Sequence, residues 1–203
     1  RVVPPNVHVY PLLIPKSNRK RILNFLFSFK FISVLIKEFF LNKVFLNRFK
    51  LKMWISSYVK YCLGLQYFRK HSFDSKYLIY SYWANFECLS DAFFYDYKKI
   101  VRMHGGDFYV SRNHGYLPLR NELYNSADLL LPISKDIKNI LINNYSVDKK
   151  KVFLSYLGVD NNFEFSLKAY STFKIVSCSN LYSLKRVHLI FDVLLELSKK
   201  IDT

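Results

Sequence analysis

From residue 76 onward, short apolar runs alternate with longer stretches in which apolar residues recur every three or four positions. The short runs are rich in Ile, Leu, Val and Tyr, as buried β-strands are. The longer stretches have the period of an amphipathic α-helix. The pattern predicts strands at 76–82, 98–104, 128–133, 150–158 and 173–179, and helices at 83–97, at 117–127 and at the end of the chain, where the apolar stripe is Ile190, Val193, Leu194, Leu197 and Ile201.

A further helix is predicted directly after the third strand. Ser134 has the side chain of an N-cap, and Asp136 follows in the first turn, where a negative charge is favourable. Ile137, Ile140 and Leu141 then lie on one face of the helix. In the predicted helix 117–127, Pro118 similarly stands near the start.

The order of these elements predicts the fold class. Short apolar strands separated by helices are typical of a parallel sheet in an α/β protein, because each crossover helix returns the chain to the same edge. We therefore expect a Rossmann-like parallel sheet with helices on both faces. The length, 203 residues, is enough for one domain with a substantial core and part of another.

Glycine and polar residues follow three of the predicted strands directly. His104, Gly105 and Gly106 follow the second strand, Tyr156–Gly158 ends the fourth, and Ser179 and Asn180 follow the fifth. The chain has only five glycines, so an adjacent pair behind a histidine indicates a tight turn or a close approach of another group. Ligands bind beyond the carboxyl ends of the strands in such sheets, and we expect a cleft there.

The first third of the chain is strongly basic. Residues 1–70 contain fourteen Lys and Arg and one acid, Glu38, a net charge of +13, whereas the other 133 residues contain seventeen against fourteen, a net charge of +3. The basic residues alternate with Phe, Leu and Ile, and the uncharged apolar runs are far shorter than the ~20 residues that a membrane-spanning helix needs.

Two interpretations of residues 17–60 remain open. A basic helix with a broad apolar face can lie on an anionic membrane surface. Alternatively, its aromatic residues face the protein core and its lysines are solvated. Nucleic acid is not expected as a partner, because the basic residues alternate with aliphatic ones and no nucleic-acid motif is present.

The three cysteines, Cys62, Cys88 and Cys178, are far apart and have no histidines at metal-ligand spacing. We interpret them as buried reduced thiols and expect neither a disulfide nor a metal site.

In order and spacing, "IYSYW", "VRMHGGDFY", "ADLLLPIS", "KVFLSYLGVD" and "FKIVSCSNLYSLKRVHLI" resemble family 4 retaining glycosyltransferases. The resemblance covers about residues 76–203 and implies the GT-B fold, two Rossmann-like domains with the active site between them. It implies an N-terminal, acceptor-side domain at 1–170 without its first βα unit, and the first strand and helix of a nucleotide-sugar-binding domain at 171–203. It also implies a role in bacterial polysaccharide assembly, without metal or cofactor, in the cytoplasm at the inner face of the cell membrane.

The resemblance implies a role for each site residue. His104 would lie beside the donor sugar and orient it, Lys185 would contact the diphosphate, and the helix from about Lys185 would add its N-terminal amides. Gly105, Gly158 and Asn180 would help to bind the donor, although Asn180 stands where the family usually has arginine. Trp83 and Asp107 are candidates on the acceptor side. The partners would be a nucleotide-diphosphate sugar, a saccharide or lipid-linked acceptor and an anionic membrane.

Two family features are missing from the sequence: the glycine-rich loop after the first strand and the pair of glutamates in the C-terminal domain. We therefore expect an internal fragment of a longer enzyme, inactive alone. The alternative is a non-catalytic module that binds membrane surfaces and is built on a degenerate Rossmann half.

Overall fold

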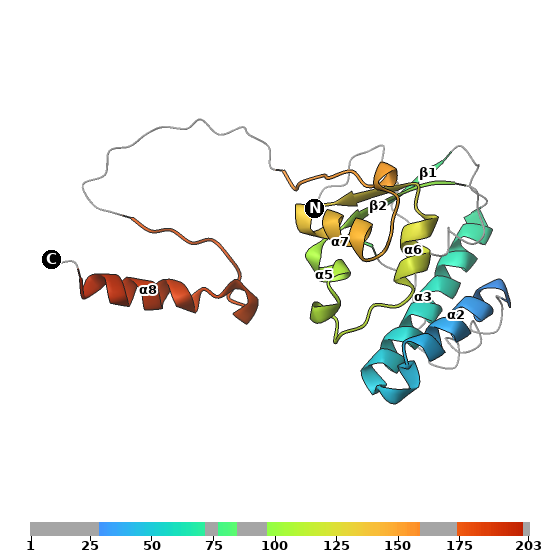
Figure 1. Cartoon of the computed structure of the whole chain (residues 1–203), viewed down its shortest axis with the longest axis horizontal. Helices are drawn as coiled ribbons and strands as arrows, with labels where there is room; N and C mark the ends of the chain where they lie inside the picture. The colour runs from blue at the N-terminus through green and yellow to red at the C-terminus, as the bar shows by residue number, and fades with distance from the viewer. Residues whose placement is uncertain (1–28, 72–76, 85–96, 159–173, 201–203) are drawn as a thin grey trace. The chain divides into compact units, whose positions relative to one another are not determined.

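The computed structural model describes residues 29–71, 77–84, 97–158 and 174–200, with side chains at 32–64, 77–84, 97–158 and 174–200. The chain divides into two compact units, Arg1–Gly158 and Val159–Thr203 (Figure 1).

The first unit contains a three-stranded parallel sheet. Its strands are β1 (Leu78–Ser81), β2 (Lys98–Met103) and β3 (Leu129–Pro132), in the order β1-β2-β3. The first three predicted strands are therefore confirmed, each slightly shorter than expected. The predicted helix 83–97 falls largely on residues 85–96, which lie outside the described residues.

The fourth predicted strand, 150–158, is wrong as a regular strand. Its first residues form a 3-10 turn, η5 (Lys149–Lys151), and Val152 makes an isolated parallel bridge to Leu130. The Phe153 and Ser155 amides still donate to carbonyls of β3, at 2.9 Å each. Among the described residues this segment has no strand on its outer side, and a strand paired along only one edge ends readily.

Three helices follow the strands. They are α5 (Gly105–Phe108), continued by the 3-10 turn η4 (Val110–Arg112), α6 (Arg120–Ser126) and α7 (Lys135–Asn143). The Ser134 side chain accepts a hydrogen bond from the Ile137 amide at 3.3 Å, which confirms the predicted cap of α7. Helix α6 begins after Leu119, which has φ 56°, so the predicted helix 117–127 loses its first residues.

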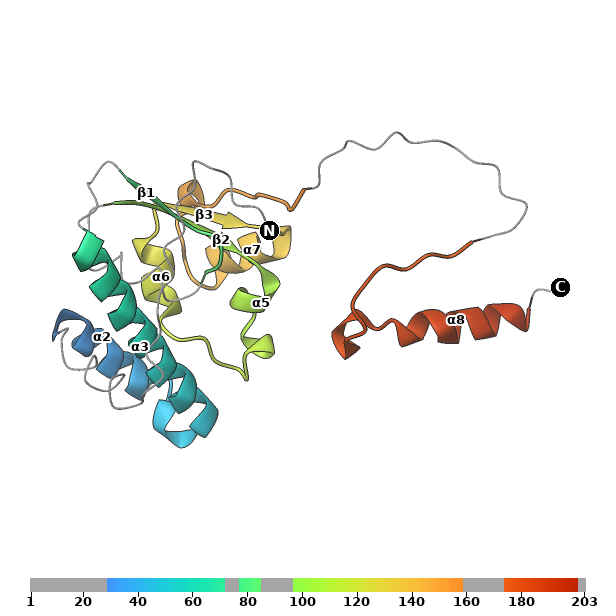
Figure 2. The ribbon, with the colours of Figure 1, turned by 180° about the vertical axis from the view of Figure 1, so that it is seen from behind.

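The core lies against one face of the sheet. Val101 and Met103 of β2 are buried, and Leu130 shares their face through the parallel register. Figures 1 and 2 together show α6 and α7 on one side of the sheet. Right-handed crossovers place both helices there, because successive strands step in one direction. The opposite face carries the exposed Tyr80. Ile100, Leu129 and Leu131 of that face are partly buried. The described residues thus form a parallel sheet with helices, which is compatible with the predicted Rossmann-like α/β fold.

The described residues of the basic first third form a helical pair, α2 (Phe29–Leu41) and α3 (Arg48–His71), joined by the 3-10 turn η2 (Val44–Leu46). Leu35, Tyr58 and Tyr61 join the same core cluster as Val101. The Glu38 carboxylate accepts hydrogen bonds from the Tyr116 hydroxyl at 2.9 Å and the Leu119 amide at 3.2 Å. Glu38 therefore ties α2 to the segment that leads into α6.

The second unit contains a 3-10 turn, η6 (Ser183–Lys185), and α8 (His188–Ser198). The predicted final helix is confirmed, but it begins three residues after Lys185. The predicted strand 173–179 is wrong over residues 174–179, which are exposed and irregular. The described part of this unit offers no other strand, and an isolated strand is not stable. For the same reason Cys178 is an exposed free thiol, whereas Cys62 is buried and free as expected; Cys88 lies outside the described residues.

Candidate functional site

His104 stands at the carboxyl end of β2 and is the N-cap residue of α5. Its own amide donates to the Asp107 carboxylate, with 2.7 Å between N and Oδ1. This bond to the third residue of the helix closes the turn that carries the histidine. The local sequence therefore fixes His104 at the strand end, where sequence reasoning expected it.

Asp107 also joins two strand ends. Its second oxygen, Oδ2, accepts a hydrogen bond from the Ala84 amide at 2.6 Å, and Ala84 follows β1. Burial raises the pKa of Asp107, whereas the amides of Ala84 and His104 and the nearby charges of His104 and Arg120 lower it. The carboxylate thus holds the turns after β1 and β2 together, a positioning role that its residue type alone did not reveal.

We expect Asp107→Ala to destabilise the protein by about 2–4 kcal/mol. The substitution leaves two buried amide donors without an acceptor, and each unsatisfied donor costs about 1–3 kcal/mol. Urea unfolding followed by circular dichroism measures the loss. Asp128→Ala is the matched control, since that carboxylate accepts from the Lys99 amide at an exposed position and should cost less. Equal losses in the two variants would contradict the anchoring role of Asp107.

The His104 imidazole lies against two aromatic rings. Its ring centroid is 4.2 Å from Trp83 and 4.9 Å from Tyr82. Among the described residues, neither ring nitrogen has a hydrogen-bond partner, and both are buried. Burial and the positive charge of Arg102 lower the pKa of His104, and Asp107 acts in the opposite direction. At neutral pH the imidazole is therefore uncharged, with one donor and one acceptor nitrogen unused.

The two adjacent glycines have different physical roles. A Cβ on Gly105 would lie 2.7 Å from Nη1 of Arg112, so this glycine permits a close approach of the guanidinium. A Cβ on Gly106 would meet no atom within 4 Å, and Gly106 lines a cavity. Neither glycine has a positive φ. The tight contact predicted after the histidine is thus present at Gly105, and open space begins at Gly106.

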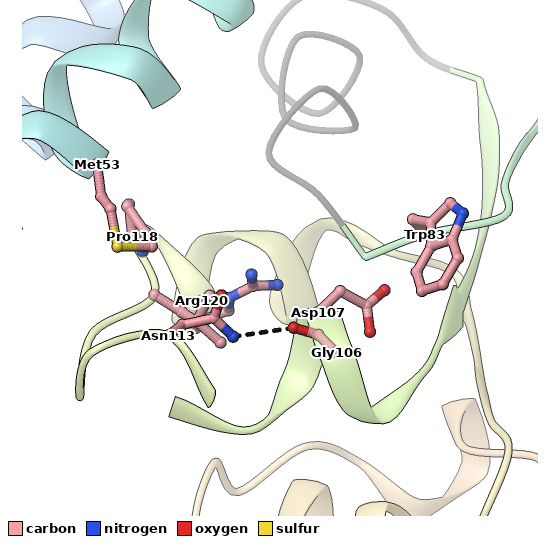
Figure 3. Close-up of a pocket in the computed structure, with 8 residues that line it drawn as sticks. Met53, Trp83, Gly106, Asp107, Asn113, Pro118 and Arg120 are labelled. Atoms are coloured by element: carbon pink, nitrogen blue, oxygen red, sulfur yellow. Dashed lines mark hydrogen bonds between the residues drawn. The ribbon is translucent and has the colours of Figure 1, made fainter. Parts of the chain in front are cut away.

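The cavity has a volume of about 350 Å³ and lies beside α5 (Figure 3). Trp83, Asp107 and Gly106 come from the strand-end turns, and Arg120 comes from the first position of α6. Sequence reasoning missed Arg120, because nothing in the pattern around an arginine at a helix start indicates burial. The remaining lining residues are Met53, Asn113, Leu117 and Pro118.

The structure brings Trp83, His104, Gly105 and Asp107 together. Gly158, by contrast, is exposed at the end of the segment that pairs with β3. Asn180 and Lys185 are exposed in the second unit, where the Asn180 amide lies 3.4 Å from the Tyr182 hydroxyl. The roles of these three residues in donor binding stay predictions.

Arg102 supports the carboxyl edge of the sheet. Its Nη2 donates to the carbonyls of Ser155 at 3.3 Å and Tyr156 at 3.1 Å, and its guanidinium lies 5.9 Å from the Tyr82 ring centroid. The side chain therefore links the segment after β3 to the turn after β1. Its position inside a predicted strand gave no sign of this role.

The described residues contain neither a metal-binding cluster nor a helix that could cross a membrane. No group of three His, Cys, Asp or Glu side chains there is arranged to hold a metal ion. None of the helices described has the length and apolar character that crossing a membrane requires.

Comparison of the chain with protein-family models, with curated proteins and with solved structures finds no match.

Proposed function

We propose that this chain belongs to a retaining glycosyltransferase that moves a sugar from a nucleotide-diphosphate donor to a saccharide or lipid-linked acceptor. The observation that supports it best is the turn after β2. There an uncharged histidine with two unused ring nitrogens stands at a strand end, two residues before Gly106, which lines a cavity of about 350 Å³. The five ordered sequence motifs point to the same class of enzyme, and the parallel sheet is compatible with a GT-B acceptor-side domain.

In this proposal His104 hydrogen-bonds a hydroxyl of the donor sugar. An uncharged imidazole suits that task better than a protonated one does, because the transition state develops positive charge on the sugar ring. The Trp83 and Tyr82 rings cover the imidazole, and both are about half exposed. A sugar would reach His104 by displacing one of them, and the ring itself would then pack against the sugar.

Binding of the leaving diphosphate is assigned to Lys185. The lysine is exposed in the turn η6, two residues before the N-cap of α8. Lys185→Ala should weaken binding of a nucleoside diphosphate by about 1.5–3 kcal/mol, the range for hydrogen bonds to charged groups. Calorimetry with UDP, GDP and ADP measures the change, and Lys200→Ala is a control that removes the same charge from the same unit. Equal affinity in the Lys185→Ala variant and the parent would show that this lysine does not bind phosphate.

The experiment that tests the function is release of nucleoside diphosphate from a panel of UDP-, GDP-, ADP- and dTDP-sugars by a longer form of the protein that contains both expected Rossmann-like domains. It is run with membranes that contain lipid-linked saccharides, and His104→Ala serves as the inactive control. The proposal is supported if sugar transfer depends on the donor and is abolished by the His104→Ala substitution. Failure to bind any nucleoside diphosphate would overturn it.

We further propose that the protein acts at the inner face of a membrane, through what we call the α2–α3 tip: Phe40, Leu41, Lys43, Phe45, Leu46 and Arg48. Its four apolar side chains are more than half exposed, with Leu46 at 70%. The Phe40 and Phe45 ring centroids lie 6.3 Å apart, so these two rings are neighbours on the surface. Figure 1 shows the turn between α2 and α3 at the end of the helical pair away from the sheet.

The same surface favours the second candidate function, a non-catalytic module that binds membranes. The two candidates differ in one measurable property. The module binds vesicles and leaves sugar nucleotides unbound, whereas the transferase binds both.

A further inference from the structure

The two charged groups that line the cavity beside α5 are bonded to other parts of the protein. Both oxygens of Asp107 accept backbone amides, one from Ala84 and one from His104. Arg120 is only 6% exposed and donates to the Ala84 carbonyl, and its side chain also hydrogen-bonds the Tyr124 hydroxyl. Neither charge therefore requires a ligand of opposite charge in the cavity.

Most of the other lining residues are apolar. Met53, Leu117, Pro118 and Trp83 supply hydrocarbon and aromatic surface, and Gly106 leaves space where a side chain would intrude. The cavity has a volume of about 350 Å³. An apolar cavity of about 150 Å³ holds one benzene ring, so this volume has room for one chain of about ten carbon atoms. The flexible methionine side chain can pack against an irregular, methyl-branched chain.

A row of side chains joins the cavity to the α2–α3 tip. The guanidinium of Arg48, a residue of the tip, lies 5.1 Å from the Phe49 ring centroid. Phe49 is 44% exposed and stacks on the His114 ring, with 5.0 Å between the centroids. Met53 lies one helical turn after Phe49 on the same face of α3, and it lines the cavity. A hydrocarbon chain that leaves a membrane at the tip therefore meets apolar side chains on the way to the cavity.

The opposite end of the cavity is at the candidate site. Figure 3 shows Met53 and Pro118 at one end of the lining and Trp83 at the other. The Trp83 ring lies against the His104 imidazole, with 4.2 Å between the centroids. The cavity thus extends from the helix that follows the tip to the aromatic ring that covers His104.

We infer that this cavity binds the prenyl chain of a polyprenyl phosphate, the lipid that carries the acceptor saccharide. The chain passes from the α2–α3 tip over Phe49 and Met53, and the phosphate-linked saccharide leaves the cavity at Trp83, beside His104. That this lipid is an acceptor rests on the proposed function, whereas its binding rests on the apolar lining. A single prenyl chain fits better than the two chains of a diacyl lipid, because the volume has room for only one chain.

The test uses the 203-residue chain with ¹³C-labelled methionine methyl groups. The chain has two methionines, of which Met53 lines the cavity and Met103 is fully buried in β2. We expect geranyl phosphate, below its micelle-forming concentration, to shift the Met53 methyl resonance and to leave that of Met103 in place. An unchanged Met53 resonance at saturating geranyl phosphate would overturn the inference.

The length and number of the chains provide a second measurement, made by calorimetry. Geranyl phosphate should bind at least about thirtyfold more tightly than isopentenyl phosphate, because five further carbon atoms leave water. It should also bind more tightly than inorganic phosphate and than dihexanoyl phosphatidate, which has two chains. Equal binding of geranyl phosphate and inorganic phosphate would contradict the inference, and so would tighter binding of the two-chain lipid.

Met53→Gln tests the apolar wall of the cavity. The substitution keeps a side chain of similar length but places an amide against the prenyl chain, so binding of geranyl phosphate should weaken at least about tenfold. Ile55→Gln is the matched control, since Ile55 is an apolar residue of the same helix, is 43% exposed and does not line the cavity. This control should bind geranyl phosphate as the parent does. Equal losses in the two variants would contradict binding at Met53.

Gly106→Val covers the case in which Met53→Gln does not fold. A Cβ at this position meets no atom within 4 Å, so the fold should survive while the added methyl groups narrow the cavity. The affinity for geranyl phosphate should fall at least about tenfold. A folded Gly106→Val variant with the affinity of the parent would show that the chain binds elsewhere.

These outcomes are separable from those of the proposed function. Binding of geranyl phosphate that depends on Met53, in a protein that binds no nucleoside diphosphate, would leave the lipid site standing and remove the transferase. Sugar transfer to soluble saccharides by a protein that does not bind geranyl phosphate would remove the lipid site alone.

Discussion

His104→Ala is expected to lower kcat at least about a hundredfold in any form of the protein that transfers sugar, with little change in fold. A preorganised hydrogen bond to the reacting group typically contributes about 10²–10³ in rate. The imidazole nitrogens bond to none of the described residues, so their loss breaks no hydrogen bond of that part of the protein. The backbone of residue 104 still donates to Asp107 after the substitution. Initial rates of sugar transfer and a thermal unfolding curve measure the two effects.

The matched control is His114→Asn. His114 is exposed and has φ 52°, a conformation that asparagine adopts well, so the fold should tolerate the change. Transfer should stay near the parent rate. If His104→Ala melts as the parent does and turns over at the parent rate, His104 does not bind the donor sugar.

The central strands could be predicted from the sequence because their pattern and their environment agree. "KKIVRM" and "LLLP" are apolar runs that lie side by side in the sheet, with Val101 and Leu130 buried between neighbours. The cap of α7 was equally predictable, because one serine hydroxyl satisfies one amide and needs nothing from elsewhere in the fold.

The outer strands could not be predicted in the same way. Residues 150–158 have a strand-like composition, but three successive lysines form a turn before Val152, and pairing with β3 continues only through two hydrogen bonds. Residues 173–179 are equally apolar, yet no strand partners residues 174–179 within the described part of their unit. The composition of a segment indicates whether its side chains suit a sheet. Whether the segment pairs as a strand depends on the strands that lie next to it in the fold.

The candidate site was predictable to the extent that it depends on strand ends. His104, Gly105 and Trp83 follow strands, and parallel strands bring their carboxyl ends to one edge. The role of Asp107 required the position of the Ala84 amide, which lies 23 residues earlier in the chain. Arg120 was missed for a similar reason. Its side chain bonds to the Ala84 carbonyl, which is distant in the sequence, and its backbone is positioned by the turn at Leu119.

The α2–α3 tip shows how structure can narrow two open interpretations of one segment. The sequence allowed the aromatic residues of the basic third either to form core or to face a membrane. In the structure Leu35, Val44 and Tyr58 are buried and belong to the core, whereas Phe40, Phe45 and Leu46 are exposed. The exposed residues gather at one turn together with Lys43 and Arg48, and that arrangement leads to a prediction about a small set of side chains.

Removing the two positive charges of the α2–α3 tip should weaken binding to anionic vesicles about thirtyfold. Each Lys or Arg near an anionic surface contributes about 1 kcal/mol, so Lys43→Asn together with Arg48→Gln removes about 2 kcal/mol. Asparagine is chosen at position 43 because Lys43 has φ 48°. Adding Phe40→Ser and Leu46→Ser should abolish measurable binding, since each buried apolar side chain contributes about 1.5–3 kcal/mol. Co-sedimentation with vesicles of neutral and of anionic lipid measures both steps.

The control is Lys149→Gln with Lys150→Gln, which lowers the net charge by the same two units at an exposed turn beside the sheet. If the tip docks on the membrane, this control binds vesicles nearly as tightly as the parent does. If the attraction depends only on the overall charge of +16, binding weakens equally in the control and in the Lys43→Asn, Arg48→Gln variant. Binding should also require anionic lipid and fall steeply between low and high salt, because the attraction fades within a Debye length of about 8–10 Å. A parent protein that stays in the supernatant with anionic vesicles at low salt would show that the exposed Phe and Leu side chains of the tip serve some other contact.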